Sequence, residues 1–426
     1  MGLRIIFNRV HRPSQWFFRR VGCTEKGKAR RSASLLNYGF LAMTMTHTLT
    51  HVFGRIHTAL FPILKSPEEF NLTLQQLGII AAIPPLCQAL LSIPVGLLSD
   101  RIGSKKLILV SLILAASGSL LASQAKNPVM LIIAISLIFM NLSIYHPASY
   151  SFTTRLFSLR NRPRALGVHG AGGTLGMALG PISVGILMGA FAFGWRHVYI
   201  FWAVPTILGA VSILMIKSEP TSDVIEESEG SEPRYQNESG SLFSSALVMF
   251  LIFIAIRMVG RMMVSTFFTT YLVFEKGFSE ELSSLIYGSS FLLGIVSAPV
   301  GGLFASRFGE KKWLLIVLPL AYISLALAIT IPNVAAFVIL YLVYGFCDIL
   351  GMAANSAIMA RLTPSRRRGL GYALFFLPSS LMGAVAPIIA ANVANAFGLG
   401  SNFIVALAVY VVGLVVLKVG VKVEPS

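Results

Sequence analysis

Gly-Leu-Leu-Ser-Asp-Arg-Ile-Gly-Ser-Lys-Lys at residues 96–106 has a similar copy, Gly-Leu-Phe-Ala-Ser-Arg-Phe-Gly-Glu-Lys-Lys, at residues 302–312. The two stretches agree at both glycines, the first leucine, the arginine and both lysines, at an offset of 206 residues. Each follows an apolar run long enough to cross a bilayer, which takes about 20 residues. A basic loop repeated once per half predicts a membrane protein built from two related halves.

The same offset links other parts of the chain. Gly54-Arg55 corresponds to Gly260-Arg261, and Arg155-Leu156 corresponds to Arg361-Leu362. A two-residue slip also aligns residues 166–181 with residues 370–387. Several matches at one offset indicate a duplication of six spans plus six spans.

Composition supports this interpretation. The chain has 426 residues, of which 55% are hydrophobic and 12% are charged, and its mean hydropathy is +0.76. That balance excludes a soluble globular protein and predicts a polytopic membrane protein. We therefore expect an all-α integral membrane fold of twelve transmembrane helices. The apolar spans lie near residues 36–63, 74–98, 107–124, 129–152, 166–190, 198–216, 245–273, 282–304, 313–331, 335–359, 370–394 and 402–420.

Charge distribution predicts the orientation. Placing the N-terminus in the cytoplasm puts 27 Lys/Arg on the cytoplasmic side and only 4 in the outer loops, as the positive-inside rule requires. The net charge of +17 therefore reflects membrane topology and does not indicate a nucleic-acid partner. We predict both termini in the cytoplasm and the plasma membrane as the location. The expected domains are a basic cytoplasmic segment at 1–32, a six-helix bundle at 33–216, an acidic cytoplasmic linker at 217–243, a second six-helix bundle at 244–420 and a tail at 421–426.

Sequence signatures of enzymes and metal sites are missing. Cys23, Cys87 and Cys347 are too few and too scattered for a disulfide framework or a metal site. We find no histidine–glutamate metal signature and no phosphate-binding loop. We therefore expect no enzyme activity, no metal site and no cofactor. The sequence also contains no ATPase module.

Ionisable residues inside the spans are few: Arg55, Arg257, Arg261 and Asp348. Each costs about 2.5–3.5 kcal/mol at mid-span, so such residues are candidates for function. Three positive charges against one acid leave an excess that a bound anion would neutralise, and an arginine fork suits carboxylate or phosphate. Two other roles stay open: Arg257 as a structural partner of Asp348, and Arg55 reaching the membrane interface.

Three histidines in the spans are candidate proton carriers, because imidazole titrates near neutral pH. His47 and His51 precede Arg55 at four-residue spacing and form a polar stripe on the first span. His146 lies in the fourth span, and we expect it and its neighbour Tyr145 to be residues of the substrate or coupling cavity. The alternative for each is a hydrogen-bonded packing residue.

With twelve spans, a central linker and the repeated loop, the chain resembles the major facilitator superfamily along nearly its whole length. Residues 96–106 match that family's pattern G-x-L-x-D-R-x-G-x-K-K. The resemblance implies that helices 1, 4, 7 and 10 line a central cavity, and that the loop pins the helix 2–3 junction against helix 11 when the protein faces outward. In the second copy Ser306 replaces the acid, which weakens the case for a symmetric latch. The gating-loop residues implied are Gly96, Asp100, Arg101, Gly103, Lys105, Arg307 and Gly309, with Asp100 and Arg101 as the gating charges.

Helix 5 carries a glycine stripe that is similar to a motif common in the family's exporters. Gly172, Gly176 and Gly180 recur every four residues and make one face free of side chains, suited to close helix packing. Pro181 removes a backbone hydrogen bond there and gives the helix a place to flex. The stripe is compatible with an antiport role and with plain packing.

Shorter segments resemble two branches of the family. Five segments are similar to the fosmidomycin-resistance branch: His47 to Phe61-Pro62, Phe70-x-Leu-Thr, Tyr145-His146-Pro147, Gly172-Gly173-x-x-Gly176 and Thr269-x-Tyr271-Leu272. Paired arginines on helices 1 and 7 resemble the organophosphate-exchanger branch instead, where each supplies a substrate-binding arginine.

Together these patterns predict a secondary transporter that moves a small organic anion by alternating access, with H⁺ as a candidate coupling ion. A proton-coupled drug efflux antiporter is the first alternative, and a transport-dead membrane receptor is a distant third. The partners expected are a small anionic molecule and the lipid bilayer, and the resemblance implies a monomer.

Overall fold

The computed structural model describes residues 34–158, 161–216, 244–363 and 368–422, and every regular element in these ranges is a helix. The basic N-terminal segment and the acidic linker predicted from the sequence lie outside the described residues. The same holds for the side chains of residues 96–101, within the repeated loop.

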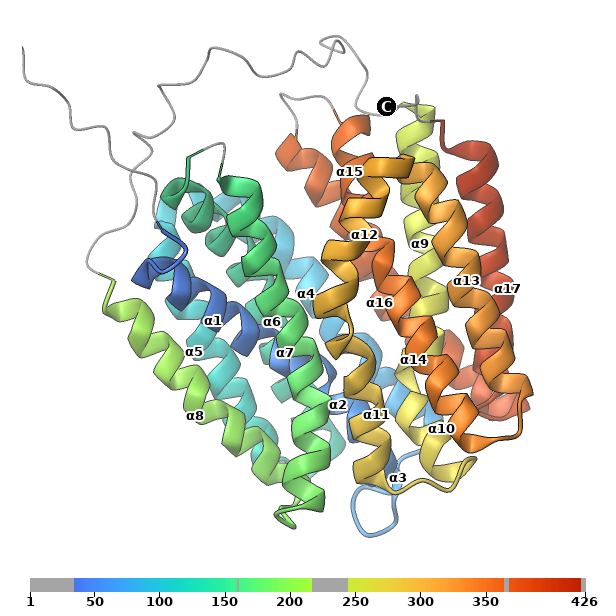
Figure 1. Cartoon of the computed structure of the whole chain (residues 1–426). Helices are drawn as coiled ribbons and strands as arrows, with labels where there is room; N and C mark the ends of the chain where they lie inside the picture. Colours follow the sequence, from blue (N-terminus) through green and yellow to red (C-terminus); the bar gives the residue numbers. More distant parts are fainter. Residues whose placement is uncertain (1–33, 159–160, 217–243, 364–367, 423–426) are drawn as a thin grey trace, which may run out of the picture. The chain divides into compact units, whose positions relative to one another are not determined.

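The first half holds six spans, and the first of them is broken into short pieces (Figure 1). Its elements are α1 (Tyr38–Val52), η1 (Phe53–Arg55), α2 (Ile56–Ala59), α3 (Phe61–Lys65), α4 (Leu74–Ile102), α5 (Ser104–Ser123), α6 (Pro128–Leu156), α7 (Arg162–Gly189) and α8 (Trp195–Leu214).

The second half repeats this pattern, again with six spans. Its elements are α9 (Ser245–Thr266), α10 (Phe268–Phe274), α11 (Glu280–Leu292), α12 (Gly294–Phe308), α13 (Glu310–Thr330), α14 (Val334–Leu350), α15 (Met352–Leu362), α16 (Arg368–Phe397), α17 (Ser401–Val415) and η4 (Val416–Gly420).

Helix boundaries follow local capping chemistry. Thr73 and Gln76 form a capping box at the start of α4, in which each side chain accepts a hydrogen bond from the other residue's main-chain N–H. Gly103 ends α4 with φ 86°, and Gly309 ends α12 with φ 84°. Both values lie in a region that favours glycine, so the repeated glycine lets the chain turn sharply between consecutive spans.

The duplication is also visible in side-chain contacts. Nζ of Lys105 donates to the carbonyl oxygens of Leu214 and Ile216 at the end of α8. Lys311, at the matching position, donates to the carbonyl of Lys418 in η4. A cation at a helix C-terminus satisfies carbonyls that have no partner within the helix. The two basic loops therefore stabilise corresponding junctions in the two halves.

The arginines that match across the repeat also hold equivalent places. Arg155 donates to Ser104 Oγ at the start of α5. Arg361 pairs with Glu310 at the start of α13, with 3.2 Å between Nε and Oε1. We call this side of the molecule, where α4 meets α5 and α12 meets α13, the basic end; it lies at the top of Figure 1.

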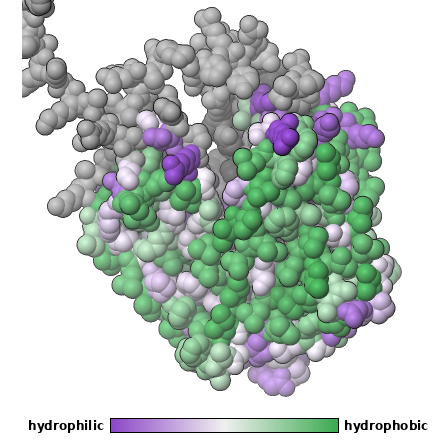
Figure 2. Space-filling model, viewed as in Figure 1, coloured by the Kyte–Doolittle hydropathy of each residue, from purple (hydrophilic) through white to green (hydrophobic). Residues whose placement is uncertain are grey.

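Apolar side chains cover the face between the two ends (Figure 2). Leu303, Ile339 and Ile404 are more than 60% exposed, far from the pattern of a soluble surface. Among the described residues, eleven helices are long and apolar enough to cross a bilayer. The broken first span adds a twelfth, because its pieces are each too short to be counted alone. The chain is an integral membrane protein of two pseudo-symmetric six-helix bundles, as predicted.

The two halves contact each other closely at the end opposite the basic end. Thr269 Oγ1 donates to the carbonyl oxygen of Thr58 at 2.7 Å, and the hydroxyl of Thr58 lies 3.5 Å from that of Tyr287. The rings of Phe61 and Phe267 approach to 6.0 Å between centroids. These contacts join α2 and α3 of the first half to α10 and α11 of the second half.

Candidate functional site

A cavity of about 180 Å³ lies between the two halves. Its polar lining comes from His51, Arg55, His57, Thr58 and Thr266. The rest of the wall is formed by small or apolar residues: Gly54, Ala81, Pro85, Phe139, Leu142, Met177, Met262, Gly383 and Pro387. A mostly apolar wall with a few convergent polar groups is typical of a small-molecule site.

Arg55 gives the cavity its positive charge. The residue ends η1, the short 3₁₀ segment that interrupts the first span between α1 and α2. Its guanidinium carbon lies 5.6 Å from the centroid of the Phe291 ring, which belongs to the other half. Within the described part of the chain, no carboxylate lines the cavity and none pairs with this arginine. Arg55 therefore presents a cation to any bound molecule.

The other three charged residues of the spans gather inside the second half. Arg257 Nη2 lies 2.6 Å from Asp348 Oδ1 and also donates to the Asp348 carbonyl at 2.8 Å. Arg261 Nε lies 3.6 Å from Asp348 Oδ2. One carboxylate thus faces two guanidinium groups, so the cluster keeps a net positive charge. Arg257 and Asp348 have less than 10% of their side chains exposed, whereas Arg261 retains 23%.

This arrangement differs from the cavity that the resemblance implied. Arg257, Arg261 and Asp348 are not among the residues that line the cavity, and the tenth span (α14 and α15) contributes no lining residue among those described. The first, fourth and seventh spans line the cavity as the resemblance implied, and α4, α7 and α16 add Ala81, Met177 and Gly383 among others. The physical reason is that Asp348 turns toward α9 to compensate Arg257, because an unpaired buried charge is costly.

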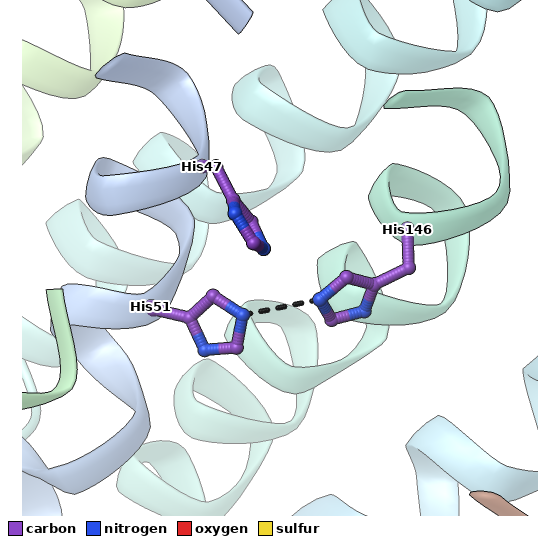
Figure 3. Close-up of side chains that lie close together, drawn as sticks. All are labelled: His47, His51 and His146. Atoms are coloured by element: carbon purple, nitrogen blue, oxygen red, sulfur yellow. Dashed lines mark hydrogen bonds between the residues drawn. The ribbon is translucent and has the colours of Figure 1, made fainter. Parts of the chain in front are cut away.

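The histidines form a group within the first half (Figure 3). His51 Nε2 lies 3.1 Å from His146 Nε2, and the His47 ring lies 4.7 Å from the His51 ring between centroids. Of the three, only His51 is among the residues that line the cavity. The spacing of His47 and His51 predicted that they share a face of the first span, but the approach of His146 to both was not predicted, and no metal site was expected. That contact depends on how α1 packs on α6, which the spacing of residues along the chain does not reveal.

Tyr145 is a packing residue in this structure. Its hydroxyl donates to the carbonyl oxygen of Met43 and lies 2.8 Å from Thr46 Oγ1. The side chain is fully buried and holds α6 against α1. The cavity residues His57, Thr58 and Thr266 were not predicted. Their sequence signal is weak because none extends the four-residue stripe of the first span.

The three glycines of the stripe lie in α7, the fifth span, directly against the first span. A Cβ on Gly172 would come within 2.9 Å of the Thr44 carbonyl oxygen, and one on Gly176 would come as close to the Cβ of His51. At Gly180 the same atom would overlap the Val52 carbonyl. The stripe therefore lets α7 and α1 pack backbone to backbone. Pro181 follows it inside α7, which stays helical through that point.

The structure describes only some of the side chains in the repeated loop at residues 96–106 and 302–312. The helix α4 continues through residues 96–102, but the side chains of Gly96, Asp100 and Arg101 lie outside the described residues. Gly103 and Gly309 form the turns, and Lys105 caps α8. The guanidinium of Arg307 lies 5.9 Å from the ring of Phe308. Ser306, which replaces the acid, donates to the carbonyl of Leu303 within its own helix.

Comparison with known proteins assigns the chain to a family. The family model of the Major Facilitator Superfamily matches residues 40–321 and 250–426. The chain belongs to the Major Facilitator Superfamily. This membership confirms the resemblance predicted from the repeated loop, and it indicates a transporter of small molecules rather than an enzyme.

Three similarities illustrate the family's range. The fosmidomycin resistance protein of Escherichia coli is 25% identical over 67% of this chain and 68% of its own length. The probable nitrate transporter NarT of Staphylococcus haemolyticus is 24% identical over 79% of this chain and 84% of its own. Among solved structures, a bacterial homologue of the human lysosomal transporter Spinster, in an inward-facing and occupied conformation, superposes with a TM-score of 0.75. It is 16% identical, and the match covers 90% of this chain and 96% of that one.

Proposed function

We propose that this protein is a secondary active transporter that carries a small organic anion through the membrane by alternating access. The observation that supports this most is Arg55, a cation in the wall of the cavity between the two halves. No acid in the described lining compensates it. Moving an uncompensated charge into a low-dielectric site is costly, so an anionic substrate that pairs with the guanidinium gains affinity there.

The second charge cluster adds to this preference. Arg257, Arg261 and Asp348 together carry one positive charge close to the cavity wall. Arg261 keeps 23% of its side chain exposed, and its Nε lies 3.6 Å from Asp348 Oδ2. Residues on both sides of the cavity thus favour an anion. The similarity to the probable nitrate transporter NarT is consistent with anion transport.

The cavity volume favours a small substrate. About 180 Å³ is below the roughly 300–1,000 Å³ that drug-sized ligands occupy. Proton-coupled drug efflux remains the second candidate, supported by the apolar wall of Phe139, Met177 and Met262 and by the fosmidomycin resistance relative. The two functions coincide if the exported compound is a small anion. A transport-dead receptor has no feature of the described residues in its favour.

We further propose the orientation that the charge bias indicates, with the basic end and both termini in the cytoplasm of a plasma membrane. The contacts of Thr58 and Phe61 with the second half then close the outer side, and the cavity belongs to a state closed to the outside. We expect the protein to act as a monomer. H⁺ is the coupling ion we propose, with His57 as a titratable group that lines the cavity.

Transport in proteoliposomes tests this function. Purified protein is reconstituted, and uptake of labelled benzoate and methylphosphonate is compared with uptake of a lipophilic cationic dye. We expect saturable uptake of one or both anions and none of the dye. Uptake of the dye alone supports drug efflux and contradicts the proposal.

A further inference from the structure

Three imidazoles converge inside the first half, and the transport proposal gives them no combined role. His47 and His51 come from α1, one turn apart, and His146 comes from α6 (Figure 3). One ring nitrogen from each lies within 4.8 Å of the other two. The Nε2 atoms of His51 and His146 are 3.1 Å apart. Two nitrogens bound to one tetrahedral ion at about 2.0–2.1 Å stand about 3.3 Å apart, so this pair already has the spacing of two ligands.

The backbone sets the protonation of His47. Its Nδ1 lies 2.7 Å from the carbonyl oxygen of His169, and since a carbonyl can only accept, Nδ1 carries the proton. The lone pair of the ring is therefore on Nε2, a buried atom with no hydrogen-bond partner in the described structure. Metal-binding histidines donate their second ring nitrogen to a carbonyl or carboxylate in this way. His47 thus has the second-shell contact of a ligand and an unused electron pair.

The neighbouring helix leaves room for these rings. A Cβ on Gly173 of α7 would lie 2.7 Å from His47 Cε1 and 3.0 Å from His51 Cδ2. Any side chain at residue 173 would therefore displace two of the three imidazoles. The His47 ring also stacks on the His169 ring at 4.1 Å between centroids. These contacts restrict the orientation of His47.

We propose that His47, His51 and His146 bind one divalent transition-metal ion, of the class of Zn²⁺. Neutral imidazole nitrogens suit Zn²⁺ and its first-row neighbours, whereas Mg²⁺ and Ca²⁺ require oxygen ligands. The fourth position is left for water on the side where His51 faces the cavity. All three ligands belong to the first half, so the ion stays with that half when the two halves move relative to each other.

Metal binding to the purified full-length chain tests this proposal independently of transport. The protein carries a purification tag without histidine, is stripped with a chelator and is then equilibrated with Zn²⁺ or Co²⁺. We expect one metal ion per chain by elemental analysis, and a Co²⁺ visible spectrum of tetrahedral intensity. His51→Gln and His146→Gln should each abolish stoichiometric binding. His57→Gln is the matched control: it removes a buried histidine from the same span but outside the cluster, and should leave binding unchanged.

Gly173→Ala is a second variant that keeps all three ligands. Its methyl group would push against His47 and His51, so we expect it to lose the ion as well. No stoichiometric ion in the wild-type protein overturns the proposal, as does full binding in both His→Gln variants. If these variants fail to fold, the wild-type Co²⁺ spectrum decides: a weak octahedral spectrum contradicts the site, and an intense tetrahedral one supports it.

Discussion

The guanidinium of Arg257 holds Asp348 at two points, one on the carboxylate and one on the main-chain carbonyl. The carbonyl of Asp348 lies near the end of α14, where the tenth span breaks before α15. The contact therefore joins a buried charge pair to a helix break. Arg261 approaches the second carboxylate oxygen from one turn further along α9.

Removing the acid from this cluster should destabilise the protein. Asp348→Asn leaves Arg257 buried without a countercharge, a loss of about 3–5 kcal/mol for pairs of this kind. Thermal unfolding of the detergent-purified variant should show a clearly lower midpoint. Replacing both partners, as in Arg257→Met with Asp348→Leu, should recover most of that loss. An unchanged midpoint in Asp348→Asn would show that the pair has no structural role.

The glycine stripe of α7 should tolerate no side chain, whereas other glycines of the same helix should. Gly176→Ala forces a methyl group against Thr48 and His51, and such overpacking costs about 1–3 kcal/mol. Gly170→Ala is the control, because a Cβ there meets nothing within 4 Å. It should be neutral or stabilising by about 0.5–1 kcal/mol, as Ala is favoured over Gly in a helix. Equal unfolding midpoints for the two variants would contradict this packing.

The turn glycines of the repeated loop should be equally sensitive. Gly103→Ala and Gly309→Ala each force a side chain into positive φ, at a strain of about 1–3 kcal/mol. The two variants should lower the unfolding midpoint to a similar extent, because the turns have nearly the same conformation. Gly302→Ala, a helical glycine of the second copy with ordinary space around it, should have little effect. A loss confined to one half would show that the two turns are not equivalent.

The proposed orientation can be measured with single cysteines. After Cys23, Cys87 and Cys347 are replaced by serine, Lys126→Cys and Lys418→Cys place a thiol at opposite ends of the molecule. An impermeant maleimide applied to right-side-out vesicles should label residue 126 at once and residue 418 only after the membrane is opened. The reverse order of labelling would invert the topology.

Much of the fold was predictable because membrane spans leave strong signals. Twelve apolar runs, the loop at residues 96–106 and its copy at 302–312 determine the architecture without any contact information. The break of the first span at Phe53–Arg55 was not predicted. It leaves the apolar character of the span unchanged, so hydropathy does not register it.

The site was less predictable, because it depends on which helix faces meet. The sequence identified Arg55 as a candidate, and the structure places it in the cavity wall. It also left open that Arg257 pairs with Asp348, which is what the structure shows. The approach of His146 to His47 and His51 requires the packing of α6 on α1, and the missed cavity residues His57 and Thr266 have no distinctive spacing.

Anion binding at Arg55 is the central claim, and proteoliposome uptake of benzoate and methylphosphonate by Arg55→Gln tests it most directly. Arg196→Gln is the matched control, since Arg196 pairs with Glu69 outside the cavity. A charge-assisted hydrogen bond is worth about 1.5–3 kcal/mol, so Arg55→Gln should weaken the apparent affinity for the anion by about 10- to 100-fold. Arg196→Gln should transport as the wild type does. Anion uptake by Arg55→Gln with wild-type affinity would contradict the account.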